Sequence, residues 1–259
     1  MPENFESQQY RDELSKEIKK NLKEKREEIL NREKETPEYW QARTEALKER
    51  QDEEAIDDGL GVLVKKKTFY HGSGASGIKK FDKAEEDTVG SGVYFTSEAK
   101  DAINYARLRA ETIKNPDIKS RNLPQNMQYN EDATPVIYES SVENMKLCDL
   151  RKDENVKKVL VGFRDVLVKE LKNPNLKFYH QTSFMEAIGA IDDGKIWAGN
   201  LKNIAQGCGK LFSDYVGSLG YEGLITLEGG EGGGFNHDTY VIFNPDNVTI
   251  DQEHTIAIE

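Results

Sequence analysis

A histidine and two tyrosines occupy positions at which they can hold a flat ligand. His71 precedes the glycine-rich run 72–74, and glycine has no side chain that would keep a ligand from the backbone. Tyr94 stands between apolar neighbours after a second such run, 90–92, and Tyr105 follows eleven residues later. Two aromatic faces can sandwich a planar heterocycle, each stack contributing roughly 0.5–1.5 kcal/mol. The same tyrosines also fit the core of a strand–helix unit, and the residues alone leave both interpretations open.

Local sequence patterns place these residues on two strands and a helix. The residues 68–71 predict a strand that ends at the glycines, and residues 92–96 predict a second strand. Ser97 is a suitable N-cap for a helix over 98–112, whose apolar residues recur at helical spacing. The histidine thus ends the first strand, and the two tyrosines lie on the second strand and on the helix that follows it.

The order of the remaining predicted elements indicates an α+β fold. They are strands at 135–142, 223–227, 240–243 and 248–250, helices at 154–171, 182–191 and 204–219, a polar loop at 113–134 and a glycine-rich turn at 229–234. Strands at both ends with helices between them favour α+β over a doubly wound parallel sheet. Residues 72–77 satisfy a G-x-G-x-x-G string, but no convincing helix follows, which argues against a dinucleotide-binding Rossmann unit.

Charge divides the chain into an extension, 1–60, and a globular domain, 61–259. The chain has 259 residues and a net charge of −11, and charged residues and glutamine dominate roughly its first sixty positions. One apolar residue per turn recurs from Tyr10 to Ile29, and a shorter stripe follows Pro37, so two helices are expected. Because so thin a stripe cannot bury itself alone, the helices form a hairpin or lie on the domain, or they dock a protein partner.

Composition narrows the class of protein. The acidic net charge of −11, with basic residues interleaved among acids, argues against a protein that coats nucleic acid. Cys148 and Cys208 are too few for a disulfide framework and lack metal-ligand spacing, so no metal site is expected. No apolar run approaches the roughly 18 residues of a membrane span, and the charged N-terminus lacks the apolar core of a signal peptide. We expect a soluble cytoplasmic protein, or one delivered into a target cell's cytosol.

Several short runs, weak singly but specific in their joint order and spacing, resemble the ADP-ribosyltransferases. These runs are Tyr-His-Gly-Ser at 70–73, Gly-Val-Tyr-Phe-Thr at 92–96, the segment from Ala99 through Tyr105, and two closing segments at 220–225 and 240–245. The first three resemble the NAD-binding half of the diphtheria-toxin-like group, which includes the poly(ADP-ribose) polymerases, and the last two resemble its bacterial and phage members. The resemblance covers about 68–250 and implies an ADP-ribosyltransferase-like split β-sandwich with flanking helices, preceded by the N-terminal helical extension.

The resemblance implies NAD⁺-binding roles for the residues on the two strands. His71 corresponds to the histidine that binds the adenosine ribose, and Gly72 to the glycine whose backbone contacts the nicotinamide amide. Tyr94 corresponds to the triad tyrosine beside the nicotinamide ribose. The adjacent Ser73 and Phe95 are included in the expected NAD-binding set.

The helix supplies the other half of the implied nicotinamide site. Tyr105 corresponds to the tyrosine that stacks on the nicotinamide ring. Ala102 stands where polymerase-type members place a serine that binds the carboxamide. One family contact is therefore missing from this chain.

The main departure from the family pattern is Thr239, which stands where the catalytic glutamate is expected. A threonine hydroxyl cannot supply the anion that stabilises the cationic ribose as nicotinamide leaves, a role that is worth several kcal/mol in comparable sites. Three explanations stay open: a nearby acid (Asp238, Glu228 or Glu231) substitutes, or the enzyme performs mono-transfer without it, or the site binds NAD⁺ without reacting. Alternation along a strand disfavours Asp238. His237 is either an acid–base group or a turn residue, and the turn is favoured.

The sequence thus predicts a mono-ADP-ribosyltransferase with NAD⁺ as co-substrate. His71, Tyr94 and Thr239 form the expected catalytic set, and the acceptor is a macromolecule, more readily a protein than a nucleic acid. The alternatives are an inactive module that binds NAD or ADP-ribose, and an NAD glycohydrolase that uses water as acceptor. A role as a toxin or effector is compatible with each active form.

Overall fold

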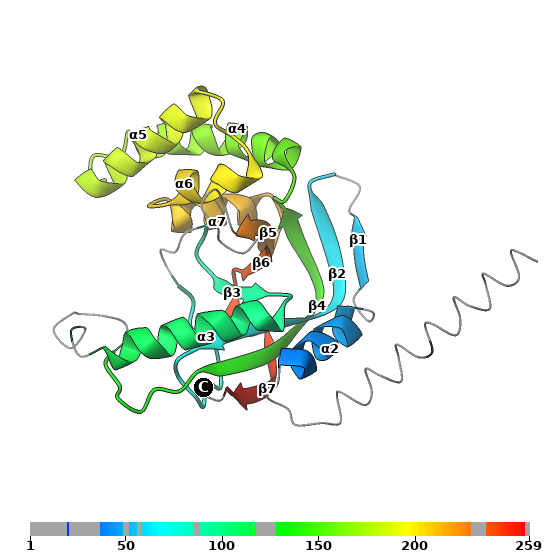
Figure 1. Cartoon of the computed structure of the whole chain (residues 1–259). Helices are drawn as coiled ribbons and strands as arrows, with labels where there is room; N and C mark the ends of the chain where they lie inside the picture. Colours follow the sequence, from blue (N-terminus) through cyan, green and yellow to red (C-terminus); the bar gives the residue numbers. More distant parts are fainter. Residues whose placement is uncertain are drawn as a thin grey trace, which may run out of the picture. The chain divides into compact units, whose positions relative to one another are not determined.

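A computed structural model describes residue 20 and residues 37–48, 52–55, 59–84, 89–115, 117, 128–228 and 237–256 (Figure 1). The chain divides into two compact units, Met1–Arg50 and Gln51–Glu259. The first unit contains helix α2 (Pro37–Lys48), in which the rings of Tyr39 and Trp40 meet edge to face at 5.1 Å. The helix expected before Pro37 lies outside the described residues.

The second unit begins with a short strand before residue 61. Strand β1 (Asp52–Ala55) pairs antiparallel with strand β2 (Gly61–Ser73). The two compact units divide between residues 50 and 51. The polar sequence of β1, Asp-Glu-Glu-Ala, carries no apolar alternation that would have predicted a strand.

Five strands of the second unit close into a barrel. The remaining described strands are β3 (Val93–Thr96), β4 (Val136–Asp149), β5 (Gly223–Glu228), β6 (His237–Ile242) and β7 (Thr249–Thr255). The sheet order is β1-β2-β3-β6-β5-β4-β7, and an additional pairing of β2 with β4 joins its two sides. Each of β2, β3, β6, β5 and β4 thus pairs with two others of these five, while β1 pairs with β2 and β7 with β4 at the edges. The β4–β5 pair is parallel and the other pairs are antiparallel.

Along each barrel strand, side chains point alternately into the barrel and outward from it. One core cluster takes members from all five barrel strands, including Phe69, Phe95, Tyr240 and Ile225, so it occupies the barrel interior. A second cluster joins outward-facing strand residues to the helices that follow β4. The outer face of the β3–β6–β5 part of the sheet is therefore a helix-covered face.

The described helices of the second unit lie outside the barrel. They are α3 (Ala99–Lys114), α4 (Asp153–Glu170), α5 (Phe178–Asp192), α6 (Leu201–Ala205) and α7 (Gly209–Ser218), with short 3₁₀ helices η3 (Ala198–Asn200) and η4 (Pro245–Asn247). Figure 1 shows α4 to α7 gathered at one end of this unit, while α3 crosses beside β2, β3 and β4. Strands flank the helices along the chain, and the α+β prediction is confirmed.

Two local predictions were wrong. The single helix expected over 204–219 is interrupted, because Gly207 adopts a φ of +77° between α6 and α7. The N-cap of α3 is Glu98 and not Ser97. The side chain that serves this end is Thr96, whose Oγ1 accepts a hydrogen bond from the Glu98 amide at 3.1 Å.

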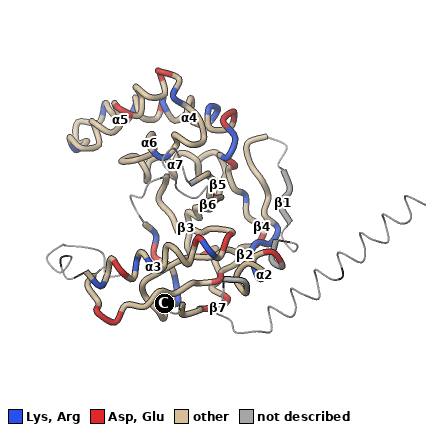
Figure 2. Tube along the Cα trace, viewed as in Figure 1, with Lys and Arg blue, Asp and Glu red and all other residues tan. Residues whose placement is uncertain are grey.

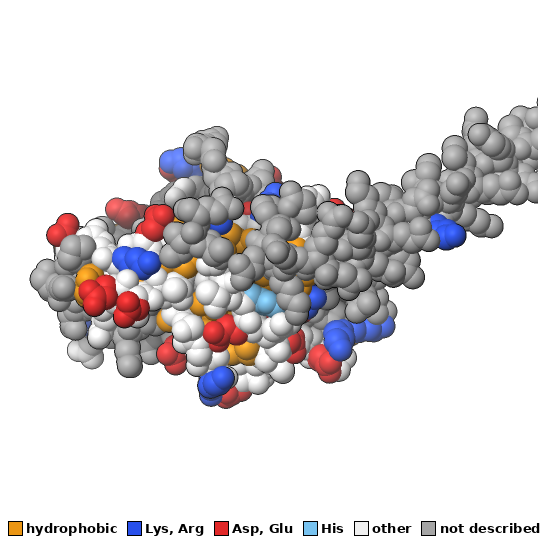
Figure 3. Space-filling model, turned by 60° about the horizontal axis from the view of Figure 1, so that its bottom comes forward, with side chains coloured by type: hydrophobic (Ala, Val, Ile, Leu, Met, Phe, Trp, Pro, Cys, Tyr) orange, Lys and Arg blue, Asp and Glu red, His pale blue; other side chains and the backbone are white. Residues whose placement is uncertain are grey.

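The surface mixes charge signs. Figure 2 shows basic and acidic residues interspersed along α3, α4 and α5. On the face seen in Figure 3, the hydrophobic atoms that are drawn in colour form small separate patches among polar and charged ones. Among the described residues, no helix is both long and apolar enough to cross a bilayer.

Candidate functional site

Helix α3 is seated against the end of β2 by two glycines. A Cβ added to Gly72 would lie 2.1 Å from the Ala102 carbonyl oxygen and 3.0 Å from the Tyr105 Cβ. A Cβ added to Gly74 would lie 2.9 Å from the Ala110 amide nitrogen. The glycines were expected to leave room for a ligand, but helix α3 takes that space. They thereby set the position of Tyr105.

The strand register separates the predicted site residues onto two faces. Tyr94 pairs with Val241 and Thr96 with Thr239, so Tyr94 and Thr239 share a face. Val241 belongs to the cluster beneath the helices that follow β4, so this face is the outer one. Gly72 shares it, since α3 covers it from outside.

His71 lies on the opposite, inner face. Its ring contacts the rings of Phe81 and Phe95, with centroids at 4.9 and 5.8 Å. Its Nδ1 lies 2.8 Å from the Tyr94 carbonyl oxygen, which only accepts, so Nδ1 carries the hydrogen. Burial lowers the pKa of His71, the hydrogen bond to Tyr94 opposes this shift, and Arg109 adds to it. The neutral ring therefore presents Nε2 as an acceptor.

Phe95 and Ser73 have structural contacts. The Phe95 side chain is 2% exposed and packs within the barrel core. The Ser73 Oγ accepts a hydrogen bond from the Ala75 amide at 3.1 Å and stabilises the turn after β2.

The Tyr94 hydroxyl is engaged by the loop before β3. It donates to the Gly90 carbonyl oxygen at 2.7 Å and accepts from the Val89 amide at 3.0 Å. The Ser91 amide in turn donates to Ser213 Oγ of α7 at 2.6 Å. The partly buried Tyr94 ring packs against the helix-covered cluster. Its polar tip therefore orders the loop before β3.

Tyr105, His237 and Asp101 form a contact cluster between α3 and β6. Tyr105 is 42% exposed, and its ring centroid lies 6.1 Å from that of His237 in an edge-on arrangement. His237 Nδ1 lies 3.9 Å from Asp101 Oδ2, with side-chain exposures of 6% and 2%. His237 is the first residue of β6 and is buried, so its interpretation as a turn residue was wrong.

Thr239 lies at the centre of the outer face. It is 3% exposed and pairs with Thr96 on one side and with Thr226 on the other. Over the described part of the chain, its Oγ1 has no hydrogen-bond partner. A buried hydroxyl without a partner costs about 1–3 kcal/mol, which a ligand hydroxyl can relieve.

Of the three acids considered as substitutes for the glutamate, Asp238 is held elsewhere. Arg151 donates to both Asp149 oxygens at 2.8 and 2.9 Å and to Asp238 Oδ2 at 2.7 Å. Burial raises the pKa of Asp149, but its hydrogen bonds with Arg151 outweigh this and leave the pKa below its ordinary value. Glu228 stands opposite His237 in the β5–β6 ladder, while its side chain and Glu231 lie outside the described part.

Sequence reasoning missed Asp101 and misplaced His237. Asp101 precedes Tyr105 by four residues, and this spacing puts two side chains on one helix face. The sequence therefore did indicate an acidic side chain beside Tyr105. His237 carried no such signal, because only strand pairing brings it to α3. Among the described residues, no group of three histidine, cysteine or acidic side chains is placed to hold a metal ion.

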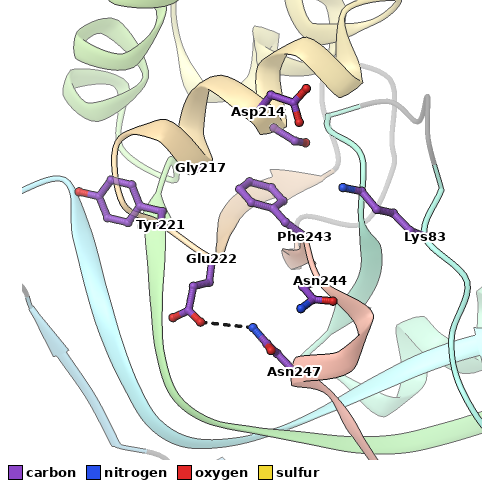
Figure 4. A pocket seen from close by; sticks show the side chains of 9 residues that line it. Lys83, Asp214, Gly217, Tyr221, Glu222, Phe243, Asn244 and Asn247 are labelled. Carbon is purple, nitrogen blue, oxygen red and sulfur yellow. Dashed lines mark hydrogen bonds between the residues drawn. The ribbon is translucent and has the colours of Figure 1, made fainter.

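A separate pocket of about 330 Å³ lies beside α7 (Figure 4). Figure 4 shows Phe243 and Tyr221 in its wall, with Lys83 and Asp214 at its sides. Glu222 and Asn247 are joined there by a hydrogen bond of 3.2 Å. None of the predicted site residues lines this pocket.

Comparisons with known proteins add little to this geometry. No protein-family model matches the chain, and no curated protein matches it. Among solved structures, it is similar to a chain in the crystal structure of the M. tuberculosis MbcT–MbcA toxin–antitoxin complex. The identity is 11% over 83% of this chain and 91% of that chain, with a TM-score of 0.38. A TM-score of this size establishes neither a family nor an activity.

Proposed function

We propose that this protein is a mono-ADP-ribosyltransferase of the diphtheria-toxin-like type. It uses NAD⁺ as co-substrate on the outer face between α3 and β6 and transfers ADP-ribose to a macromolecular acceptor. Its barrel is then the split β-sandwich of that group, with the N-terminal helices as an appended segment that contacts a protein partner. The mixture of charge signs favours a protein over a nucleic acid as the acceptor.

One observation carries the proposal. Gly72, Tyr105 and Thr239, which are far apart in the sequence, all lie on the outer face of the sheet, and this shared face supports the proposal. Tyr105 is fixed over this face by the close approach of α3 to Gly72 and by its ring contact with His237. An exposed aromatic ring whose position is fixed by these two contacts can stack on the nicotinamide ring.

The roles within the site follow from these positions. Nicotinamide stacks on Tyr105, with the Tyr94 ring nearer the helix-covered side. The unpartnered Thr239 hydroxyl bonds a hydroxyl of the adjoining ribose. His71 faces the barrel interior, and its part in the proposal is to hold the Tyr94 backbone, whose carbonyl oxygen lies 2.8 Å from His71 Nδ1. Holding NAD⁺ in a reactive orientation then supplies much of the acceleration.

The group that takes the place of the absent glutamate decides whether the site transfers ADP-ribose or only binds NAD⁺. Asp238 is excluded as a substitute by its bond to Arg151 and its place on the other face of β6. Glu228, opposite His237 in the ladder, is the remaining acid next to the site whose backbone is described. A Glu228→Gln variant tests whether it supplies the anion.

The experiment is incubation of the full chain with NAD⁺ labelled in the adenylate half, together with a lysate as acceptor source. Label transferred to protein supports the proposal. Free ADP-ribose with nicotinamide indicates a glycohydrolase, and neither product with measurable NAD⁺ binding indicates an inactive module. The Tyr94→Ala and Tyr105→Ala variants should weaken NAD⁺ binding. If both keep the binding and turnover of the parent protein, the site is assigned wrongly.

A suitable control is Tyr179→Ala. Tyr179 is 59% exposed on α5 and lies outside the proposed site, so its removal takes away an exposed aromatic ring of the same kind. Each lost stack at the site should weaken NAD⁺ binding by roughly two- to tenfold, from 0.5–1.5 kcal/mol. The control should leave NAD⁺ binding unchanged.

A further inference from the structure

Two histidines of the second unit are buried beside a carboxylate in closely similar ways. His237 Nδ1 lies 3.9 Å from Asp101 Oδ2, and His254 Nε2 lies 3.9 Å from Glu139 Oε2. All four side chains are less than one-tenth exposed. The two pairs differ in location. His254 pairs with Ile137 at the β4–β7 edge, whereas His237 borders the proposed NAD⁺ site.

His237 is within reach of a ligand held by Tyr105 and Thr239. It lies two residues from Thr239 on the same face of β6, which is a separation of roughly 7 Å along a strand. Its ring touches the edge of the Tyr105 ring. A nicotinamide stacked on Tyr105, with its ribose at Thr239, therefore brings the bond to be broken next to His237.

Asp101 equips His237 to accept a proton. The carboxylate faces the Nδ1 edge of the imidazole, which leaves Nε2 as the nitrogen on the opposite edge. A negative charge within about 4–6 Å favours the protonated ring, so a proton received at Nε2 is stabilised where it arrives. Asp101 also sits in the first turn of α3, whose position is fixed by Gly72.

We propose that His237 is the general base of the transfer reaction and that the acceptor group is a hydroxyl. This inference rests on the proposed function. The hydroxyl oxygen bonds to the ribose C1′ as the C1′–nitrogen bond breaks, and nicotinamide leaves as a neutral molecule with that electron pair. The hydroxyl proton passes to His237 Nε2, and Asp101 stabilises the resulting imidazolium. A carboxylate acceptor has no proton to remove and would not need this residue.

The groups around His237 fix the expected pH dependence. Asp101 and Tyr105 face it from α3, and Glu228 stands opposite it in β5. Asp238, next to it in β6, is directed to the other face and bound by Arg151. A general base acts only in its unprotonated form, so the rate of nicotinamide release should depend on pH.

The first test measures kcat and KM for nicotinamide release by the full chain between about pH 5 and 9. His237→Gln should lower kcat by about 10²–10⁴-fold, make kcat less dependent on pH and leave KM for NAD⁺ nearly unchanged. Asp101→Asn, which removes the carboxylate 3.9 Å from His237 Nδ1, should lower kcat with little change in KM. His254→Gln, the matched control, should keep the parent profile. Circular dichroism checks that each variant folds.

The second test uses azide, a nucleophile whose attacking nitrogen carries no proton. Azide should restore nicotinamide release by His237→Gln by about tenfold or more, because the step no longer needs a base. Tyr105→Ala, which affects binding, should gain nothing. This separates a missing base from a damaged site.

The outcomes distinguish the two proposals. If the parent protein releases nicotinamide and His237→Gln keeps both its rate and its pH profile, the general base is wrong and the proposed function stands. If the parent protein releases no nicotinamide, the proposed function fails and the general base fails with it. If His237→Gln does not fold, Asp101→Asn decides, and an Asp101→Asn protein with the parent kcat overturns the role.

Discussion

The Gly72→Ala substitution tests how the packing of α3 against β2 is fixed. The backbone of Gly72 lies outside the left-handed region, so alanine meets no conformational strain there and only the space in front of it matters. The new Cβ would stand 2.1 Å from the Ala102 carbonyl oxygen and 2.8 Å from the Ala106 amide nitrogen. Both atoms are helix backbone and cannot rotate away.

The cost follows from that overlap. The shorter distance is about 1.3 Å below the 3.4 Å at which ordinary contact begins, so α3 must move by roughly that amount. Overpacking of this kind costs about 1–3 kcal/mol, and rigid backbone on both sides favours the upper end. A loss of about 3 kcal/mol lowers the melting temperature of a domain of this size by roughly 6–12 °C.

Thermal unfolding followed by circular dichroism measures the effect, with Gly189→Ala as the control. Gly189 lies within α5 and a Cβ there meets nothing within 4 Å. Alanine in a helix is favoured over glycine by about 0.5–1 kcal/mol, so this control should raise the melting temperature. A Gly72→Ala protein that melts at or above the parent temperature would refute the account of how α3 is positioned.

Two further predictions concern charge and thiol chemistry. Arg151→Met should lower the free energy of unfolding by about 2–4 kcal/mol at neutral pH, because it leaves Asp149 and Asp238 without their shared partner. Although burial raises the pKa of Asp149, Arg151 holds that pKa below its ordinary value. Urea titrations should therefore show the difference in unfolding free energy between parent and variant shrinking as the pH falls below about 4. A difference that does not change with pH would contradict the pairing. Burial raises the pKa of the Cys208 thiol to about 12, and Cys148 is buried too. A thiol reagent at about pH 8 should therefore label neither cysteine until the protein is unfolded. Rapid labelling of the native protein would show that the core opens.

The sequence predicted elements well where a single periodicity runs without interruption. The helix over 154–171 matches α4 within a residue at each end, since its apolar face repeats regularly. The strand expected at 135–142 continues to Asp149 as β4. The prediction ended too early because the residues at 143 and 144 are polar and interrupt the apolar pattern that marks a strand, and residue 144 has a φ of +52°. Gly207 ended a helix for a conformational reason that periodicity does not show.

For the site, the sequence determined which elements carry the residues, and tertiary structure decided which faces they share. Tyr105 on a helix after the Tyr94 strand followed from local pattern alone. The inward position of His71 and Phe95 and the arrival of His237 beside Asp101 depended on strand register and on the closing of the barrel. A shift of one residue in register reverses the face of every side chain on a strand, and that register is set by pairing between segments far apart in the chain. Local sequence can therefore name the strand but not the face that meets the ligand.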